Sequence, residues 1–180
     1  MLEVILVGYP ASQELVGVSK ILVEKYIGVT PTYLNHEGPV NEWSKFVKSY
    51  LEGITNERII FGLDDYLIEG CDKERLAEAI LMEPCVKLCA STEEEHSEYP
   101  VTTQYTIWNR LELIDLLGKT TNPWDFEING SKLFKGASIL HTCLDYDVHS
   151  ALSSRWEGVR YSPKILDECI EHLWTIPKSI

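Results

Sequence analysis

The sequence predicts an α/β fold in which helices cover both faces of a mostly parallel β-sheet. Short apolar runs alternate with segments of helical periodicity from residue 2 to residue 90. Such an alternation implies parallel strands joined by right-handed crossovers. The composition, 44% hydrophobic and 10% aromatic in 180 residues, is that of a globular chain that can bury one core. We therefore expect a single compact domain spanning residues 1–180.

The first strand and the first helix follow directly from local patterns. Residues 2–8 form a nearly continuous apolar run that ends in Gly8-Tyr9-Pro10, as expected of a buried strand followed by a turn. Ser12 is a candidate N-cap for a helix whose apolar residues keep to one face and which stops at Gly28. A short second strand is expected at residues 32–35.

The next elements continue the alternation. Pro39 precedes a strongly amphipathic helix that runs from Trp43 to Ile54. Residues 58–63 form an apolar third strand that runs straight into two aspartates. Asp72 is a candidate N-cap for a helix that ends before Pro84, and a fourth strand is expected at 86–90.

The second half of the chain is less regular. The pattern predicts a strand at 105–108, a short helix at 111–117 that ends at Gly118, and a turn into another short helix at 122–127. A strand pair is expected at 137–148. A last helix is expected to begin at Ser162-Pro163.

Charge and cysteine content limit the classes of ligand and compartment. Sixteen Lys and Arg against 28 Asp and Glu give a formal net charge of −12, whereas duplex-binding proteins carry a basic surface. Nucleic acid is therefore an unlikely partner, and an anionic ligand would need a bound cation or a helix N-terminus. Five cysteines without a tight framework are typical of reduced thiols. Because no basic leader and no membrane-spanning apolar run is found, we expect a cytoplasmic protein.

The acidic pair Asp64-Asp65 is the clearest candidate site. It follows the third strand, and ligands of open α/β sheets bind outside the carboxyl ends of the strands. Adjacent carboxylates repel unless a cation lies between them or one is protonated, and their hard oxygens favour Mg²⁺ or Mn²⁺. Such an ion would let an acidic protein hold a diphosphate. The dipeptide alone is more typical of a solvated turn, where Asp is favoured by its local hydrogen bonds.

A second candidate site combines tryptophans with amides and acids. Gln104, Trp108 and Asn109 lie in one segment, and Trp124, Asp125 and Glu127 lie in another. Indole rings beside polar side chains are suited to hold a sugar, and Asp125 or Glu127 would then be a general base for a hydroxyl. The alternative is that both tryptophans are core anchors and that both acids belong to the first turn of a helix.

These segments resemble glycosyltransferases of GT-A type from bacterial surface-polysaccharide clusters and from large viruses or phages. The resemblance rests on three segments in this order: residues 59–66 (IIFGLDDY), Gln104-x3-Trp108-Asn109, and residues 122–127 (NPWDFE) followed by Gly130-Ser131. It spans roughly residues 2–160. It implies a GT-A-like, Rossmann-like fold of the nucleotide-diphospho-sugar transferases, and Tyr66 departs from the Asp-x-Asp that many relatives show.

The resemblance also implies roles for individual residues. The substrates would be a nucleotide-diphosphate sugar donor and a hydroxyl acceptor, such as a glycan or, as a special case, a modified base in phage DNA. The metal, Mn²⁺ or Mg²⁺, would be held by Asp64 and Asp65. The donor would contact Tyr9, Pro10, Ser12, Asp64, Gln104, Trp108 and Asn109. Trp124 would face the acceptor, and Asp125 or Glu127 would be the base of an inverting reaction.

Two downstream groups complete this hypothesis. From His141 to His149, polar and apolar residues alternate, which is typical of a strand with one solvated face. Within the glycosyltransferase hypothesis, His149 is the candidate third metal ligand. Arg155 is a candidate for neutralising the departing diphosphate, although an exposed arginine is equally compatible with the sequence.

Two other functions remain open from the sequence. A nucleotidyltransferase shares the strand-end acids and the nucleotide, but it usually has a Gly-rich loop and a Lys near the N-terminus, which Gly8-Tyr9-Pro10 does not supply. A non-catalytic nucleotide-sugar-binding or assembly protein with the same fold is the second alternative. The sequence has no Gly-x-Gly-x-x-Gly, Walker-type, Gly-x-Ser-x-Gly or His-Glu-x-x-His motif, which argues against the simplest dehydrogenases, phosphotransferases and hydrolases.

Overall fold

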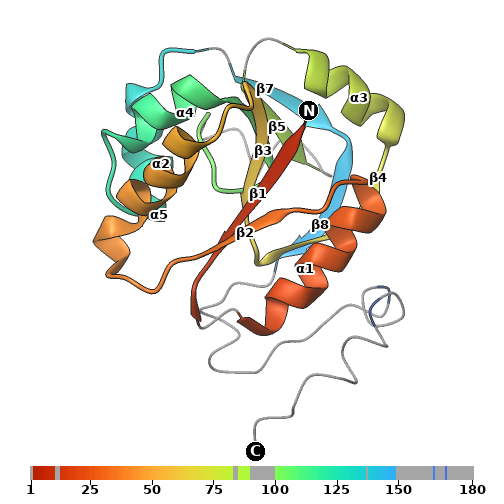
Figure 1. Cartoon of the computed structure of the whole chain (residues 1–180). Helices are drawn as coiled ribbons and strands as arrows, with labels where there is room; N and C mark the ends of the chain where they lie inside the picture. The colour runs from red at the N-terminus through yellow and green to blue at the C-terminus, as the bar shows by residue number, and fades with distance from the viewer. Residues whose placement is uncertain are drawn as a thin grey trace, which may run out of the picture.

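A six-stranded sheet forms the centre of the molecule (Figure 1). The computed structural model describes residues 2–10, 13–82, 85–89, 100–136 and 138–148, together with Lys164 and Cys169. The strand order is β2-β1-β3-β6-β5-β7. The bounds are β1 (Glu3–Gly8), β2 (Thr32–Asn35), β3 (Arg58–Leu63), β5 (Cys85–Cys89), β6 (Thr106–Asn109) and β7 (Ser138–Thr142).

The sheet is mostly parallel, as predicted. β1 runs parallel to both β2 and β3, and β5 runs parallel to β7. β6 lies between β3 and β5 and is antiparallel to both. Five strands therefore point the same way, and the carboxyl ends of β1, β2 and β3 meet at one edge.

A small antiparallel sheet pairs β4 (Tyr66–Cys71) with β8 (Leu144–Val148). The sequence pattern predicts no strand at β4. It predicts a strand pair at 137–148, and two strands do occur there, but they do not pair with each other. β7 joins β5 in the central sheet, whereas β8 joins β4. The polar residues that alternate along this segment therefore do not share one straight strand.

Five helices within the described residues flank these sheets: α1 (Gln13–Tyr26), α2 (Trp43–Gly53), α3 (Lys73–Leu81), α4 (Arg110–Leu117) and α5 (Pro123–Leu133). A short 3₁₀ turn, η2 (Val40–Glu42), leads into α2. The predicted residues that end one helix and begin another are confirmed. Gly28 follows α1 with a φ of 85°, and the Asp72 carboxylate accepts hydrogen bonds from the first-turn amides of α3. None of the described helices combines the length and the apolar character that crossing a bilayer requires.

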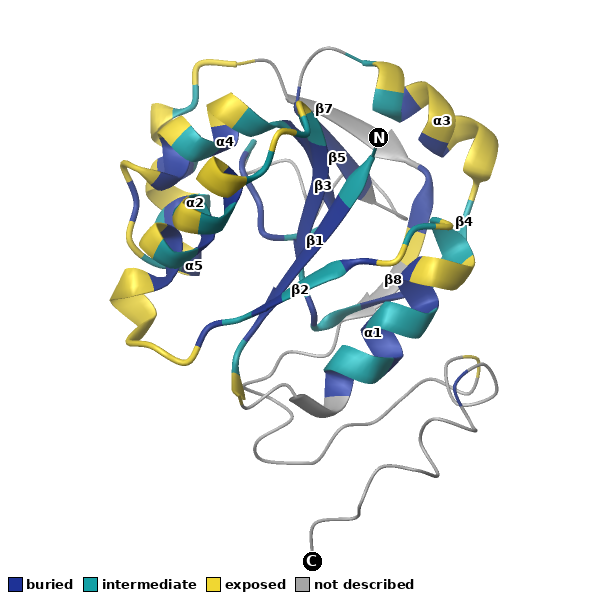
Figure 2. Cartoon of the chain, viewed as in Figure 1, coloured by how far each residue is buried: buried dark blue, intermediate teal, exposed yellow. Residues whose placement is uncertain are grey.

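Helices cover both faces of the central sheet, with a buried cluster on each side (Figure 2). Along β1, Val4 and Leu6 belong to the cluster under α1, α3 and the small sheet, whereas Ile5 and Val7 belong to the cluster under α2, α4 and α5. This is the alternation of a strand that is buried on both faces. The expected layered architecture is confirmed.

Some sequence-based predictions fall outside the described residues. Ser12, His149 and Arg155 are among these, and so is most of the helix expected after Ser162. Cys169 is described, and it is buried in the cluster on the α1 side of the sheet.

Candidate active site

Asp64 is fixed at the carboxyl end of β3 by three neighbouring elements. Its Oδ2 accepts a hydrogen bond of 3.0 Å from the Tyr33 hydroxyl of β2. Its carbonyl oxygen accepts one of 2.5 Å from Ser19 Oγ of α1, and its amide donates to the Val7 carbonyl of β1. Only 3% of Asp64 is exposed, so this aspartate holds the edge of the sheet together.

Gly8, the last residue of β1, makes room for this arrangement. A methyl group at this position would lie 2.0 Å from Asp64 Oδ2 and 2.2 Å from the Tyr33 hydroxyl oxygen. We expect Gly8→Ala to displace both side chains and to lower the free energy of unfolding by about 1–3 kcal/mol. The measurement is a urea titration followed by circular dichroism.

Gly53→Ala is the matched control for Gly8→Ala. No heavy atom lies within 4 Å of the position that a methyl group at Gly53 would take, at the end of α2. Because alanine favours helix more than glycine, this variant should be as stable as the wild type or slightly more stable. Equal stability of the Gly8 and Gly53 variants would contradict the close packing at the end of β1.

Asp65, the other member of the acidic pair, belongs to a cluster around Tyr66. The side chains of Thr103 and Gln104 lie beside the Tyr66 phenol. Burial raises the pKa of the Tyr66 phenol, and the negative charges of Asp65 and Glu127 raise it further. The carboxylates of Asp65 and Glu127 therefore lie close to the same phenol, although they are far apart in the sequence.

Glu127 reaches this cluster from α5 and is anchored to the segment that precedes β6. Its Oε1 accepts hydrogen bonds of 2.7 Å from the backbone amide and from the hydroxyl of Thr103, and one of 3.2 Å from the Thr102 hydroxyl. None of these three bonds involves Oε2. Glu127 is half-buried, so a carboxylate of defined orientation is presented beside Gln104 and Tyr66.

Asp125 lies on a different side of α5 and makes local contacts. Its Oδ2 accepts hydrogen bonds from the amide and hydroxyl of Thr121, and its Oδ1 accepts one of 2.6 Å from Asn129. The Asn129 hydrogen bond lowers the pKa of Asp125, with further lowering by Thr121. A lower pKa makes a carboxylate a weaker proton acceptor, and the contacts are those of an acid in the first turn of a helix.

Trp108 and Asn109 lie apart from the acidic cluster. Trp108 is fully buried, and its ring centroid lies 6.1 Å from that of Phe126 and 5.3 Å from that of Phe134. Asn109 pairs with Arg58 at the beginning of β3, at the other end of the strand from Asp64, and its side chain caps α4. Gln104 therefore lies beside Tyr66 at the carboxyl end of β3, whereas Trp108 and Asn109 lie elsewhere.

Trp124 and Tyr9 come from different elements, α5 and the end of β1. Trp124 is 53% exposed and lies one helical turn before Glu127 on α5. Tyr9 follows β1, and its ring meets the buried His36 ring edge-on, with the centroids 5.6 Å apart. His36 and Asn35 line a cavity of about 430 Å³ between the end of β2 and α2. Pro10 is exposed.

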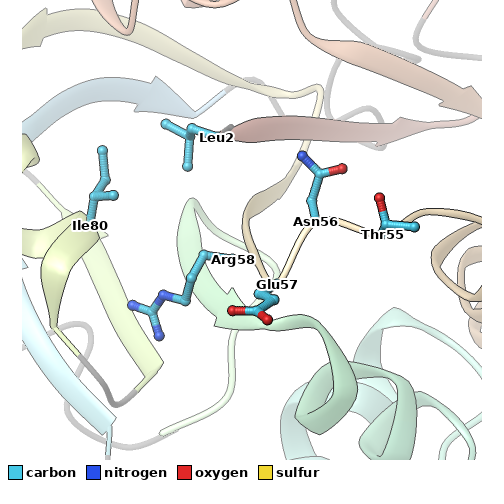
Figure 3. A pocket seen from close by; sticks show the side chains of 6 residues that line it. All are labelled: Leu2, Thr55, Asn56, Glu57, Arg58 and Ile80. Atoms are coloured by element: carbon cyan, nitrogen blue, oxygen red, sulfur yellow. The ribbon is translucent and has the colours of Figure 1, made fainter.

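A larger cavity of about 650 Å³ lies at the opposite end of the sheet (Figure 3). It is lined by Leu2, Thr55, Asn56, Glu57, Arg58 and Ile80. Leu2 precedes β1, and Arg58 begins β3, so this cavity is at the amino ends of these strands. It contains none of the residues that the sequence analysis assigns to donor, acceptor or metal.

The described residues offer carboxylate oxygens for a metal ion at Asp64 and Asp65. Within the described ranges, no group of three His, Cys, Asp or Glu side chains is arranged to hold an ion. Two carboxylates fit Mg²⁺ or Mn²⁺ when phosphate oxygens and water complete the coordination, which is how these ions usually bind in phosphate-handling sites. Asp65 is the more exposed of the pair.

Several residues that shape this edge are not predicted from the sequence. Tyr33 and Ser19 hold Asp64, while Thr103 and Tyr105 hold the segment beside Tyr66. Tyr33 and Ser19 lie inside ordinary elements, where nothing in the local pattern distinguishes them. The Thr102-Thr103 pair directly before Gln104 is the one signal that was available.

Comparisons with known proteins identify the fold. No protein-family model matches the chain, and no curated protein matches it. The crystal structure of A197 from STIV superposes with a TM-score of 0.53 at 12% identity, covering 83% of this chain and 86% of that chain. HddC from Yersinia pseudotuberculosis complexed with GMP-PN superposes with a TM-score of 0.51 at 12% identity, covering 96% and 100%.

Likeness at this level of identity establishes the fold alone. The chain has a central, mostly parallel sheet flanked by helices, and this is the nucleotide-diphospho-sugar transferase fold.

Proposed function

We propose that the chain is a metal-dependent glycosyltransferase of GT-A type, which moves a sugar from a nucleotide-diphosphate sugar to the hydroxyl of a glycan or similar acceptor. The observation that carries this proposal is the convergence of Asp65, Gln104 and Glu127 around Tyr66 at the carboxyl end of β3. Ligands of open α/β sheets bind at this edge. Asp65 would hold a cation in this arrangement, and Glu127 would accept a proton from a hydroxyl.

Asp65 and Asp64 would hold Mn²⁺ or Mg²⁺. The ion would stabilise the negative charge on the donor diphosphate. Asp64 contributes from a carboxylate that Tyr33 already orients, and Asp65 contributes from the more accessible position. His149 as a third ligand and Arg155 beside the diphosphate stay part of the proposal, outside the described residues.

The donor would extend from the acidic pair toward β1 and β2. Tyr9 faces the nucleoside in this proposal, with Pro10 and Ser12 in the same turn and the cavity beside His36 and Asn35 next to it. Gln104 contacts the sugar from the other side. HddC, one of the superposed structures, is complexed with GMP-PN, which agrees with a nucleotide as the ligand of this fold.

Glu127 is the proposed general base. The acceptor hydroxyl lies between Glu127 and the donor sugar, and Trp124 packs against the acceptor one helical turn away. Glu127 accepts the hydroxyl proton while the oxygen forms a bond to the anomeric carbon. The bond from that carbon to the diphosphate breaks, and its electron pair leaves with the diphosphate. Asp125 is less suited, because its lowered pKa and its contacts to Thr121 and Asn129 serve the helix.

Removal of the Asp65 charge tests the proposal. We expect Asp65→Asn to weaken Mn²⁺-dependent binding of UDP or GDP at least tenfold, because the carboxylate that faces the cation is lost. Calorimetric titration with and without Mn²⁺ measures this effect. Asp115→Asn, an exposed change on α4, is the control and should bind like the wild type. Unchanged binding by the Asp65 variant would place the metal elsewhere.

Assays of the reaction products separate the two alternatives. A nucleotidyltransferase would release pyrophosphate when it is given a nucleoside triphosphate and a sugar phosphate. A non-catalytic protein would bind nucleotide sugars without transfer or hydrolysis. Neither outcome is expected if Glu127 acts as a base toward an acceptor hydroxyl.

A further inference from the structure

The two carboxylate oxygens of Glu127 have different surroundings. Oε1 accepts hydrogen bonds of 2.7 Å from the Thr103 amide, 2.7 Å from the Thr103 hydroxyl and 3.2 Å from the Thr102 hydroxyl. A carboxylate only accepts hydrogen bonds, and bonds to a charged group are stronger than bonds between neutral groups. Among the described residues, none donates a hydrogen bond to Oε2. Oε1 is therefore fixed by the protein, and Oε2 is left to a substrate.

Thr103 is itself fixed to the strand that leads to the acidic pair. It is 3% exposed, and its carbonyl oxygen accepts a hydrogen bond of 3.0 Å from the amide of Leu63, the last residue of β3. Leu63 directly precedes Asp64 and Asp65. Because threonine is β-branched, few χ1 angles are open to it, and its hydroxyl keeps its direction. Thr103 thus ties the Glu127 carboxylate to the end of β3.

A second contact joins α5 to the segment before β6 without involving the carboxylate. Ser131 Oγ accepts a hydrogen bond of 3.1 Å from the Val101 amide and donates one of 3.3 Å to the Val101 carbonyl oxygen. Ser131 lies one helical turn after Glu127 on α5. Because this contact and the Thr103 amide would remain, loss of the Thr103 hydroxyl should loosen the Glu127 side chain more than it moves the helix.

We propose that Thr103 is a positioning residue of the transfer site, which fixes Oε1 of Glu127 and so presents Oε2 to the acceptor hydroxyl. This inference rests on the proposed function. In the transfer step, the hydroxyl proton passes to Oε2 while the hydroxyl oxygen forms a bond to the anomeric carbon. The bond from that carbon to the diphosphate breaks, and its electron pair leaves with the diphosphate. Orientation matters because small displacements of a reacting group cost large factors in rate.

Two substitutions at Thr103 are the first test. Thr103→Val removes the hydroxyl and keeps the shape of the side chain, whereas Thr103→Ser retains the hydroxyl. We expect kcat for sugar transfer to fall about tenfold in the valine variant and less than about threefold in the serine variant. The KM for the donor and the Mn²⁺-dependent Kd for UDP or GDP should change less than about twofold in both. An unchanged kcat in Thr103→Val, or an equal fall in Thr103→Ser, would overturn the inference.

Ser131→Ala is the matched control, because it removes a hydroxyl from the other contact between α5 and the same segment. Like Thr103→Val, it should lower the free energy of unfolding in a urea titration. Its kcat should stay within about twofold of the wild type, since the Glu127 carboxylate keeps all three hydrogen bonds. A fall in kcat equal to that of Thr103→Val would show that any loosening of α5 slows transfer, and it would overturn the inference.

The double variant Glu127→Gln/Thr103→Val tests whether Thr103 acts through Glu127. Once the base is absent, Thr103 has no proton acceptor to orient. We therefore expect kcat of the double variant to lie within about twofold of that of Glu127→Gln alone. Multiplicative losses would show that Thr103 affects the rate by another route, which contradicts the proposed role.

A measurement without turnover separates this inference from the proposed function. In urea titrations, Thr103→Val and Glu127→Ala should be coupled, with the unfolding constant of the double variant departing at least threefold from the product of the single effects. If the wild type is active and this coupling is absent, the positioning role alone is wrong. If the wild type neither binds nor turns over nucleotide sugars, the proposed function fails and takes the catalytic role of Thr103 with it, even where the coupling is present.

Discussion

Glu127→Gln is expected to lower kcat for transfer by a factor of about 10² to 10⁴, which is the usual contribution of a positioned general base. The amide cannot accept the proton of the acceptor hydroxyl. It does retain an oxygen that can replace Oε1 as the acceptor for Thr103, so the fold and donor binding should be preserved. The measurement is steady-state transfer from a nucleotide sugar, with the Kd for UDP or GDP determined in parallel.

Asp125→Asn is the matched control for this prediction, because it neutralises the neighbouring acid of the same helix. Its contacts to Thr121 and Asn129 are local, so we expect a loss of stability of about 1 kcal/mol and a kcat close to that of the wild type. A large fall in kcat for Asp125→Asn with an active Glu127→Gln would reverse the two roles. Equal, complete loss of donor binding in both would indicate that α5 acts on the donor and not on the acceptor.

Trp108→Ala is expected to lower the free energy of unfolding by about 3–5 kcal/mol, because it removes a fully buried ring from the core between β6 and α5. The lost contacts include those with Phe126 and Phe134. Urea unfolding followed by circular dichroism measures the change. A variant of unchanged stability that fails to bind nucleotide sugars would support the donor-lining role expected from the resemblance instead.

Trp124→Ala provides the comparison within the same chain. This tryptophan is 53% exposed on α5, so its removal should change the stability by less than about 0.5 kcal/mol. If Trp124 packs against the acceptor, the KM for the acceptor should rise while donor binding is kept. Removal of Trp108 is thus expected to change stability, whereas removal of Trp124 is expected to change the KM for the acceptor.

Local patterns were sufficient to predict most of the strands and helices. The apolar run of β3, the Asp72 cap and the Gly28 stop each act over a few residues, and each appears as expected. β4 was missed because a short strand of this kind is stabilised by its partner, β8, more than seventy residues later in the chain. The reversed direction of β6 was missed for the same reason, since strand direction is set by non-local pairing.

The candidate site likewise contains some residues that the sequence predicts and others that only the fold brings together. Sequence alone located the acids at the end of β3 and the Trp-Asp-Phe-Glu segment, because strand ends and helix starts are local features. The packing of α5 against the segment before β6 decides which of these residues gather, because it brings Glu127 to Thr103 beside Tyr66 and leaves Asp125 with local contacts to Thr121 and Asn129. The same packing places Trp108 in the core.

The chain by itself determined the α/β architecture and the acidic strand end, because hydrophobic periodicity and turn residues act between near neighbours. Only the tertiary structure distinguished Asp64, held by Tyr33 and Gly8, from the more accessible Asp65. Likewise, only the tertiary structure joined Glu127 of α5 to the amide and hydroxyl of Thr103. These contacts depend on hydrogen bonds and close packing between segments distant in sequence. The spacing of residues within one segment does not predict such contacts.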